Sequence, residues 1–279
     1  MRNEDVFEAV ADALKRGEPA ALVTIIRAQG STPQRVGAKM LVFPDGRIVG
    51  TIGGGCYEND AFWKAREAIK GRRPLTVKFE LNDDFAQQTG LVCGGQMEVF
   101  IEPVEPSPEV YVFGAGHVGY FVVKMAHEVG FKVHVIDDRE KFASTERFGE
   151  GIDVVVDHIP SWIETHQLPP TAYAVIVTRG HTHDLDALRA LTANPLRYLG
   201  LIGSKAKVKR IYEALLEEGL PPEALRAVHA PIGLDIGAIT PQEIAVSILA
   251  ELIAVKHGRI AEPNVAAVSM RWDGALLKQ

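Results

Sequence analysis

The stretch VYVFGAGHVGYFVVKMAHEVGFKVHVIDDR, residues 110–139, decides the fold of this chain. It opens with an apolar run typical of a buried strand, turns through Gly114, Gly116 and Gly119, continues at helix length and ends in a second apolar run at Asp137. Such glycines permit a tight turn, close approach of the backbone to a pyrophosphate and close packing of helix on strand, while the helix N-terminus attracts the anion. Asp137 stands where a carboxylate accepts hydrogen bonds from ribose hydroxyls. The stretch predicts a Rossmann unit that can hold NAD(P) or another nucleotide, although the same glycines can also serve the turn alone.

The region after this stretch repeats the same alternation of short apolar runs and helix-length segments. Further runs rich in β-branched residues fall at residues 153–157, 173–180 and 197–204. Continuous apolar runs of this length are typical of strands buried on both faces, and the helices between them imply right-handed crossovers. We therefore predict an α/β fold whose C-terminal part, residues 110–258, is a Rossmann-like, doubly wound parallel sheet.

Several polar residues follow the predicted strands, where ligands bind in such folds. His117 comes directly after the second glycine of the loop and faces either the crevice or solvent. Ser204 is expected to cap a helix, or to form part of an anion seat, and Asp184 is a natural capping residue or a metal ligand. Thr240, followed three residues later by Glu243, predicts a capping box.

The region before the stretch has a different pattern and predicts a smaller α+β domain over residues 1–103. A helix is expected over about residues 4–16, a hairpin around residues 44–46 and a second helix that ends at Gly71. Residues 104–109 form a proline-rich linker in which we expect no regular structure. The last segment, residues 259–279, has weak periodicity and is expected to form a C-terminal tail outside the Rossmann-like domain.

Composition restricts the function. The 279 residues include 30 Lys and Arg against 36 Asp and Glu, a net charge of −6, and show no basic block, which argues against nucleic acid as a partner. No apolar run approaches the ~20 residues of a membrane span, and the N-terminus lacks the apolar core of a secretory signal. Two cysteines are too few for a disulfide framework, so we expect a reducing, cytoplasmic environment.

The first cysteine lies at a predicted helix start. Gly53, Gly54 and Gly55 directly precede Cys56. Successive glycines allow backbone N–H groups to curl into an anion-binding concavity, and a thiolate is stabilised at a helix N-terminus. These residues are therefore candidates for binding a cofactor.

The second cysteine has similar neighbours. Cys93 precedes Gly94 and Gly95 at the start of a predicted strand, where backbone can approach a ligand closely. Two other interpretations remain open: both cysteines are small buried packing residues, or they form one redox pair. Arg35, in a polar loop, is a candidate for binding an anionic group.

The order of short motifs along the chain resembles one family, the xanthine dehydrogenase accessory proteins of the XdhC/CoxI type. In the first half these motifs are GSTPQRVGAKM (30–40), GTIGGGCYE (50–58) and CGG (93–95), together with EVFIEP. In the second half they are VFGAGHVG (112–119), IDDR (136–139), ERF (146–148), TRGH (178–181), LIGSK (201–205) and PIGLDIGA (231–238). One departure is Gln34, where the family's STPR stretch has arginine and where neighbouring Arg35 can substitute.

The resemblance implies a maturation factor. Such a protein holds the molybdenum cofactor, a molybdopterin, supports its sulfuration by a cysteine desulfurase and delivers it to a xanthine dehydrogenase-like apoenzyme, and we expect it to act as a homodimer. The resemblance thus implies a carrier rather than a catalyst. Two hypotheses from other classes remain: a nicotinamide-dependent oxidoreductase built on the Rossmann unit, and a thiol redox sensor that uses Cys56 and Cys93.

Overall fold

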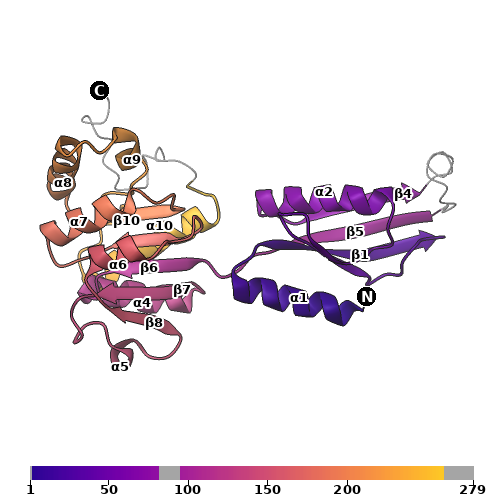
Figure 1. The fold of residues 1–279 in the computed structure, drawn as a ribbon, viewed down its shortest axis with the longest axis horizontal. Coiled ribbons are helices and arrows are strands. Elements are labelled where there is room, and N and C mark those ends of the chain that lie inside the picture. The colour runs from indigo at the N-terminus through magenta and orange to yellow at the C-terminus, as the bar shows by residue number, and fades with distance from the viewer. Residues whose placement is uncertain (1, 82–94, 261–279) are drawn as a thin grey trace. The chain divides into compact units, whose positions relative to one another are not determined.

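The computed structural model describes residues 2–81 and 95–260 (Figure 1). The chain divides into two compact units, residues 1–107 and 108–279. Predictions made for Cys93, Gly94 and nearly all of the tail lie outside the described residues. No helix in the described part of the chain is both long and apolar enough to cross a membrane.

The first unit is built on a five-stranded antiparallel sheet in the order β3-β2-β1-β5-β4. The turn Asp45–Gly46 joins β2 and β3, as the hairpin prediction requires. The described elements are α1 (Asn3–Arg16), β1 (Ala20–Gly30), β2 (Lys39–Val42), β3 (Ile48–Gly50), α2 (Cys56–Gly71), β4 (Leu75–Leu81) and β5 (Gly95–Val104).

Two helices cover the two faces of this sheet (Figure 1). The stripe of small residues on α2, Ala61, Ala65 and Ala68, packs against β1 and β5 in one core, because alanine lets the helix approach the sheet closely. Val6 and Ala13 of α1 pack with Leu41 and other residues in a second core on the opposite face. The predicted α+β arrangement of this region is confirmed.

The second unit is built on a parallel sheet in the order β10-β9-β6-β7-β8. A bridge between Gly200 and His229 extends it by one more parallel segment. The elements are β6 (Glu109–Phe113), α4 (His117–Glu128), β7 (Lys132–Asp137), α5 (Thr145–Phe148), β8 (Ile152–Val156), α6 (Ile159–Thr165), β9 (Tyr173–Ile176), α7 (His181–Leu191), β10 (Tyr198–Leu201), α8 (Lys205–Glu217), α9 (Pro222–Arg226) and α10 (Pro241–Lys256).

Helices lie on both faces of the parallel sheet, as the doubly wound prediction requires. One core joins the sheet to α6, α7 and α8, and the other joins it to α4 and α10. The chain leaves β6 for one face and β9 for the other, although these two strands are direct neighbours. The loops after β6 and β9 therefore flank the switch point of the sheet, where Rossmann folds bind ligands.

The proline-rich segment differs from its prediction at both ends. Strand β5 continues through Pro103 to Val104, and β6 already begins at Glu109. Pairing of β5 with β4 stops at Ile101, whereas pairing with β1 continues, so Pro103 lies where one side of the strand has no neighbour within the described sheet. A strand tolerates proline there because the missing N–H has no ladder partner to lose. The expectation of no regular structure holds only for residues 105–108.

Candidate functional site

Three glycines lead from the hairpin into α2 and place Cys56 at its first position. The φ angles of Gly53, Gly54 and Gly55 are 124°, 76° and 82°. Residues that carry a Cβ rarely adopt positive φ angles of this size, so this turn requires glycine. Gly55 is the N-cap of α2. The thiol of half-buried Cys56 thus lies beside N–H groups that have no partner inside the helix.

The carboxylate of Glu58, which the sequence analysis did not single out, fills part of the predicted anion cradle. Its Oε2 accepts hydrogen bonds from Thr51 Oγ1 at 2.5 Å, Ile52 N at 2.9 Å and Gly54 N at 3.1 Å. The N–H of Gly53 donates to Thr51 Oγ1 at 3.0 Å. The glycine turn is therefore ordered by an internal anion, and the N–H groups of Gly53 and Gly54 are already engaged.

The loop that follows β1 brings the glycine turn and the start of β5 to one end of the first unit. A Cβ added at Gly53 would lie 2.7 Å from the Pro33 ring. A Cβ at Gly95 would lie 2.5 Å from the Gln29 carbonyl oxygen and 2.6 Å from that of Ser31. The same short loop thus packs against Gly53 and Gly95. Two further predicted cofactor-binding residues, Cys93 and Gly94, precede Gly95 outside the described residues.

Arg35 lies in this same loop and is exposed. Within the described part of the chain its guanidinium has no carboxylate partner, so its charge is available to an anion. Thr32 Oγ1 donates to the Gln34 carbonyl at 3.0 Å and shapes the turn. The thiol at the helix N-terminus and the loop that carries Arg35 therefore lie at one end of the first unit, and these residue types suit a soft, anionic ligand.

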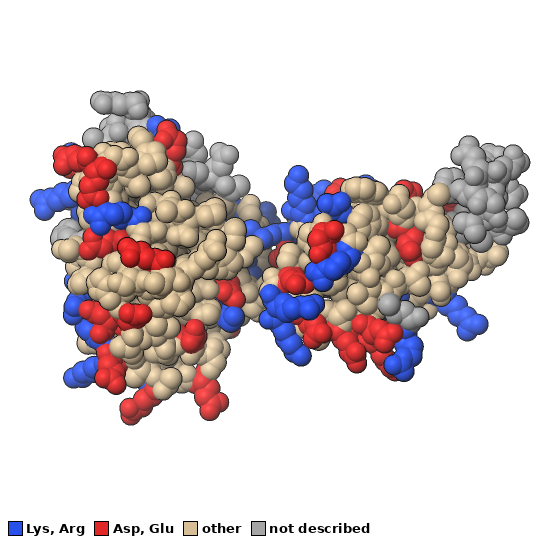
Figure 2. Space-filling model, viewed as in Figure 1, with Lys and Arg blue, Asp and Glu red and all other residues tan. Residues whose placement is uncertain are grey.

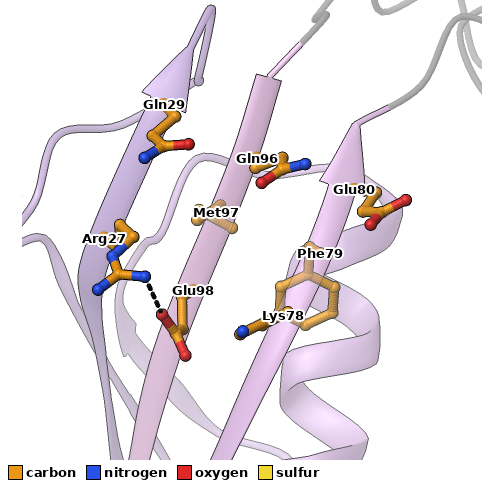
Figure 3. A pocket seen from close by; sticks show the side chains of 8 residues that line it. All are labelled: Arg27, Gln29, Lys78, Phe79, Glu80, Gln96, Met97 and Glu98. Carbon is orange, nitrogen blue, oxygen red and sulfur yellow. Dashed lines mark ion pairs between the residues drawn. The ribbon is translucent and has the colours of Figure 1, made fainter.

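The sheet face opposite α2 carries a shallow polar hollow of about 80 Å³ (Figure 3). Arg27 pairs with Glu98 at 3.6 Å, and Lys78 lies beside Glu98 on the neighbouring strand. The positive charges of Arg27 and Lys78 are balanced by the two carboxylates of Glu80 and Glu98 in this hollow. The residues that line the hollow are Arg27, Gln29, Lys78, Phe79, Glu80, Gln96, Met97 and Glu98.

In the second unit the three glycines of the loop after β6 have different roles. A Cβ at Gly114 would lie 2.5 Å from the Val177 carbonyl oxygen, and a Cβ at Gly119 would overlap the Gly114 carbonyl. Close packing against neighbouring backbone therefore explains the need for glycine at positions 114 and 119. At Gly116 no described atom lies within 4 Å of the Cβ position, and its φ of −65° suits any residue. The fold therefore does not require glycine at 116, whereas a ligand that approached the loop closely would.

Asp137 lies at the end of β7, as predicted, but its carboxylate is occupied. Ala115 N donates to it at 2.7 Å and Arg139 donates from its backbone N, Nε and Nη2 at 2.8 to 3.0 Å. Burial opposes ionisation, yet these hydrogen bonds outweigh it and hold the pKa of Asp137 below its ordinary value. The carboxylate fixes the glycine loop from within, and its contact with a ribose stays a prediction.

Arg147 supports the same loop from the other side. Its guanidinium donates to the Ala115 and Phe142 carbonyls and lies over the rings of Tyr120 and Phe148. Burial lowers the pKa of this guanidinium from its usual value. His117, a candidate for binding the cofactor, is exposed at the first position of α4.

The loop after β9 and the start of α8 are joined by a buried ion pair. Asp184 is fully buried and accepts from Thr178 Oγ1 at 2.6 Å and from Lys207 Nζ. The prediction of Asp184 as a helix cap is wrong, because Gly180 is the N-cap of α7 and Asp184 lies within the helix. Ser204 caps α8, as expected.

Helix α10 carries the predicted capping box and, further along, a buried carboxylate. Thr240 and Glu243 form the expected capping box of α10. Further along this helix, the fully buried Glu251 accepts from Tyr198 Oη at 2.6 Å and Gly233 N at 2.8 Å, and pairs with His229 Nδ1 at 2.9 Å. Burial opposes ionisation, but these partners keep the pKa of Glu251 below its ordinary value. Glu251 thereby positions the loop that starts at Gly233.

Fold and site together define a class: a Rossmann unit preceded by a small α+β unit with a cysteine at the start of a helix. The XdhC Rossmann domain matches residues 110–252, and the XdhC and CoxI family matches residues 13–80. The chain belongs to the XdhC and CoxI family.

Similar proteins cover nearly the whole chain. The uncharacterized protein YqeB of Escherichia coli (strain K12) is 35% identical over 91% of the chain, which spans only 46% of that relative. A probable xanthine dehydrogenase component from Bacillus subtilis (strain 168) is 25% identical over 90% of the chain and 97% of the relative. The molybdenum cofactor insertion chaperone PaoD of Escherichia coli (strain K12) is 20% identical over 90% of the chain and 88% of the relative. A solved structure described as a xanthine dehydrogenase from Bacillus halodurans has a TM-score of 0.51 and 25% identity, covering 93% of the chain and 97% of that protein.

Proposed function

We propose that this protein binds the molybdenum cofactor and delivers it to a xanthine dehydrogenase-like apoenzyme. The observation that carries the proposal is the meeting of Cys56 and the start of β5 at one end of the first unit, through the loop that contains Pro33. The name of the relative PaoD, a molybdenum cofactor insertion chaperone, supports the same assignment.

The residues at this end suit the cofactor as cargo. Molybdenum with sulfur ligands is soft, so the Cys56 thiolate is an appropriate contact. The phosphate of the pterin is suited to the first N–H groups of α2 and to the exposed Arg35. Glu58 takes up the N–H of Gly54, so we assign the phosphate to the start of the helix rather than to the glycine turn as a whole.

The finer parts of the proposal concern partners and place. We propose that a cysteine desulfurase supplies sulfur to the bound cofactor, that the carrier is a homodimer and that it works in the cytoplasm. Its role is transfer rather than catalysis, and contacts made by backbone and by one or two side chains suit release of the cargo.

Binding is tested by anaerobic incubation with the molybdenum cofactor followed by gel filtration. We expect molybdenum and pterin absorbance to elute with the protein in near-equal amounts. If NAD(H) is bound in place of molybdenum and pterin, the result favours the nicotinamide-dependent oxidoreductase. If no ligand is bound and Cys56 and Cys93 form a reversible disulfide, the result favours the redox sensor.

A second ligand is supported by one observation in the second unit. Gly116 leaves open the space that a Cβ would fill, and α4 and α7 both start at glycine N-caps beside the switch point. We propose that a nucleotide phosphate binds there. Asp137 remains the predicted contact for the ribose, and Arg139 already donates to both of its carboxylate oxygens. Calorimetry with nucleotides tests this, and a Gly116→Val variant that binds as tightly as the unaltered protein would contradict it.

A further inference from the structure

Helix α2 exposes a tryptophan that lies outside the hydrophobic core cluster of the first unit. Trp63 is 56% exposed, whereas Tyr57 and the three alanines of α2 are buried in the core against the sheet. Its ring meets that of Phe62 edge to face, at 5.4 Å between centroids. The Arg66 guanidinium lies 5.0 Å from the centre of the Trp63 ring. Tryptophan and arginine side by side on a surface are the residue types that dominate binding energy at protein interfaces.

The surroundings of Trp63 are basic. Residues 62–73 contain five Lys and Arg and a single acidic residue, Glu67, whereas the whole chain carries −6. Lys64 pairs with Glu67 at 2.9 Å, but Arg66 has no carboxylate partner among the residues that the structure describes. Lys and Arg side chains gather over the C-terminal end of α2 (Figure 2). This local charge is opposite to that of the molecule and favours an acidic partner.

The position of Trp63 relates this surface to the proposed cargo site. Trp63 follows Cys56 by seven residues, which is two helical turns, so both project from the same side of α2 about 10 Å apart. A protein that reached Cys56 from that side would cover Trp63 as well.

We propose that Trp63 and Arg66 form the docking surface for the cofactor-free molybdoenzyme that receives the cargo. The receiving protein offers an apolar pocket for the indole, surrounded by acidic side chains. This inference rests on the proposed function, because it takes the Cys56 end of α2 as the place from which the cofactor leaves.

The test measures the affinity of the cofactor-loaded protein for a cofactor-free xanthine dehydrogenase. Trp63→Ala and Arg66→Glu are compared with two matched controls on the second unit, Ile239→Ala at an 84% exposed apolar residue and Lys209→Glu on α8. We expect Trp63→Ala to weaken binding at least about 10-fold. Arg66→Glu should weaken it most at low salt, and the controls should bind like the unaltered protein.

The amount of cofactor held by each variant separates the two proposals. If Trp63→Ala holds the cofactor normally and also binds the apoenzyme normally, the docking surface is refuted while the carrier function stands. If the unaltered protein holds no cofactor, the carrier function itself fails. A loss of affinity only for a cysteine desulfurase, or dissociation of a homodimer in sedimentation, would assign the surface to that other partner and overturn our proposal.

Discussion

Replacement of Glu58 by alanine tests how the turn before Cys56 is ordered. One oxygen of this carboxylate accepts from Thr51 Oγ1, Ile52 N and Gly54 N. The alanine variant leaves all three donors without this acceptor. A glutamine at the same position can place its amide oxygen there, so it keeps the three bonds but loses their charge.

The magnitude follows from these three bonds. A hydrogen bond to a charged group contributes about 1.5 to 3 kcal/mol, but Glu58 is only partly buried and the released donors can reach water. Counting about 1 kcal/mol for each bond, Glu58→Ala should lower the free energy of unfolding of the first unit by about 3 kcal/mol. Glu58→Gln should cost about half as much, because a neutral acceptor remains.

Native-state hydrogen exchange of the α2 amides in the full chain measures this difference. Glu67→Gln on the same helix is the matched control: its exposed carboxylate forms a surface ion pair with Lys64, and we expect no measurable change. If Glu58→Ala exchanges like Glu67→Gln, the carboxylate does not order the turn and the reasoning is refuted.

Three further predictions concern the second unit and the segment before it. Gly119→Ala should destabilise the protein strongly and Gly116→Ala should cost less than about 1 kcal/mol, as thermal unfolding can show. Asp137 has a lowered pKa in the folded state, so its stabilisation is complete above the unfolded value of about 4 and is lost as pH falls through the folded value; Asp137→Asn should flatten this acid dependence of unfolding. Limited proteolysis with a broad-specificity protease should cut within residues 105–108 and leave two folded pieces, whereas cleavage inside β5 or β6 would contradict the strand bounds.

The elements of the fold were predictable because their signals are local. The glycines at 114 and 119, the apolar strand runs and the Thr240 capping box each identify an element within a few residues of sequence. The bounds of the proline-rich segment were misjudged because where a strand ends depends on its pairing with neighbouring strands, which is a property of the sheet register.

The site was less predictable because its contacts join distant segments. The position of Cys56 at the start of a helix was predicted from the three glycines before it, and its contact with a cofactor stays a prediction. Glu58 was missed because an acidic residue in the first turn of a helix is common and its acceptor role depends on how the turn folds back. Asp137 was placed correctly at the strand end, but its occupation by Arg139 depends on side-chain geometry that spacing does not encode.

Transfer of the molybdenum cofactor to a cofactor-free xanthine dehydrogenase tests the central claim most directly. The protein is loaded anaerobically, mixed with the apoenzyme, and the recovered dehydrogenase activity is followed over time. We predict near-stoichiometric recovery with the unaltered protein and loss of most of it with Cys56→Ser, since that change removes the soft ligand but keeps the helix start. Cys93→Ser should impair recovery equally or less, and circular dichroism should confirm that both variants fold. A folded double-serine variant that binds and delivers the cofactor at the original rate would contradict the account.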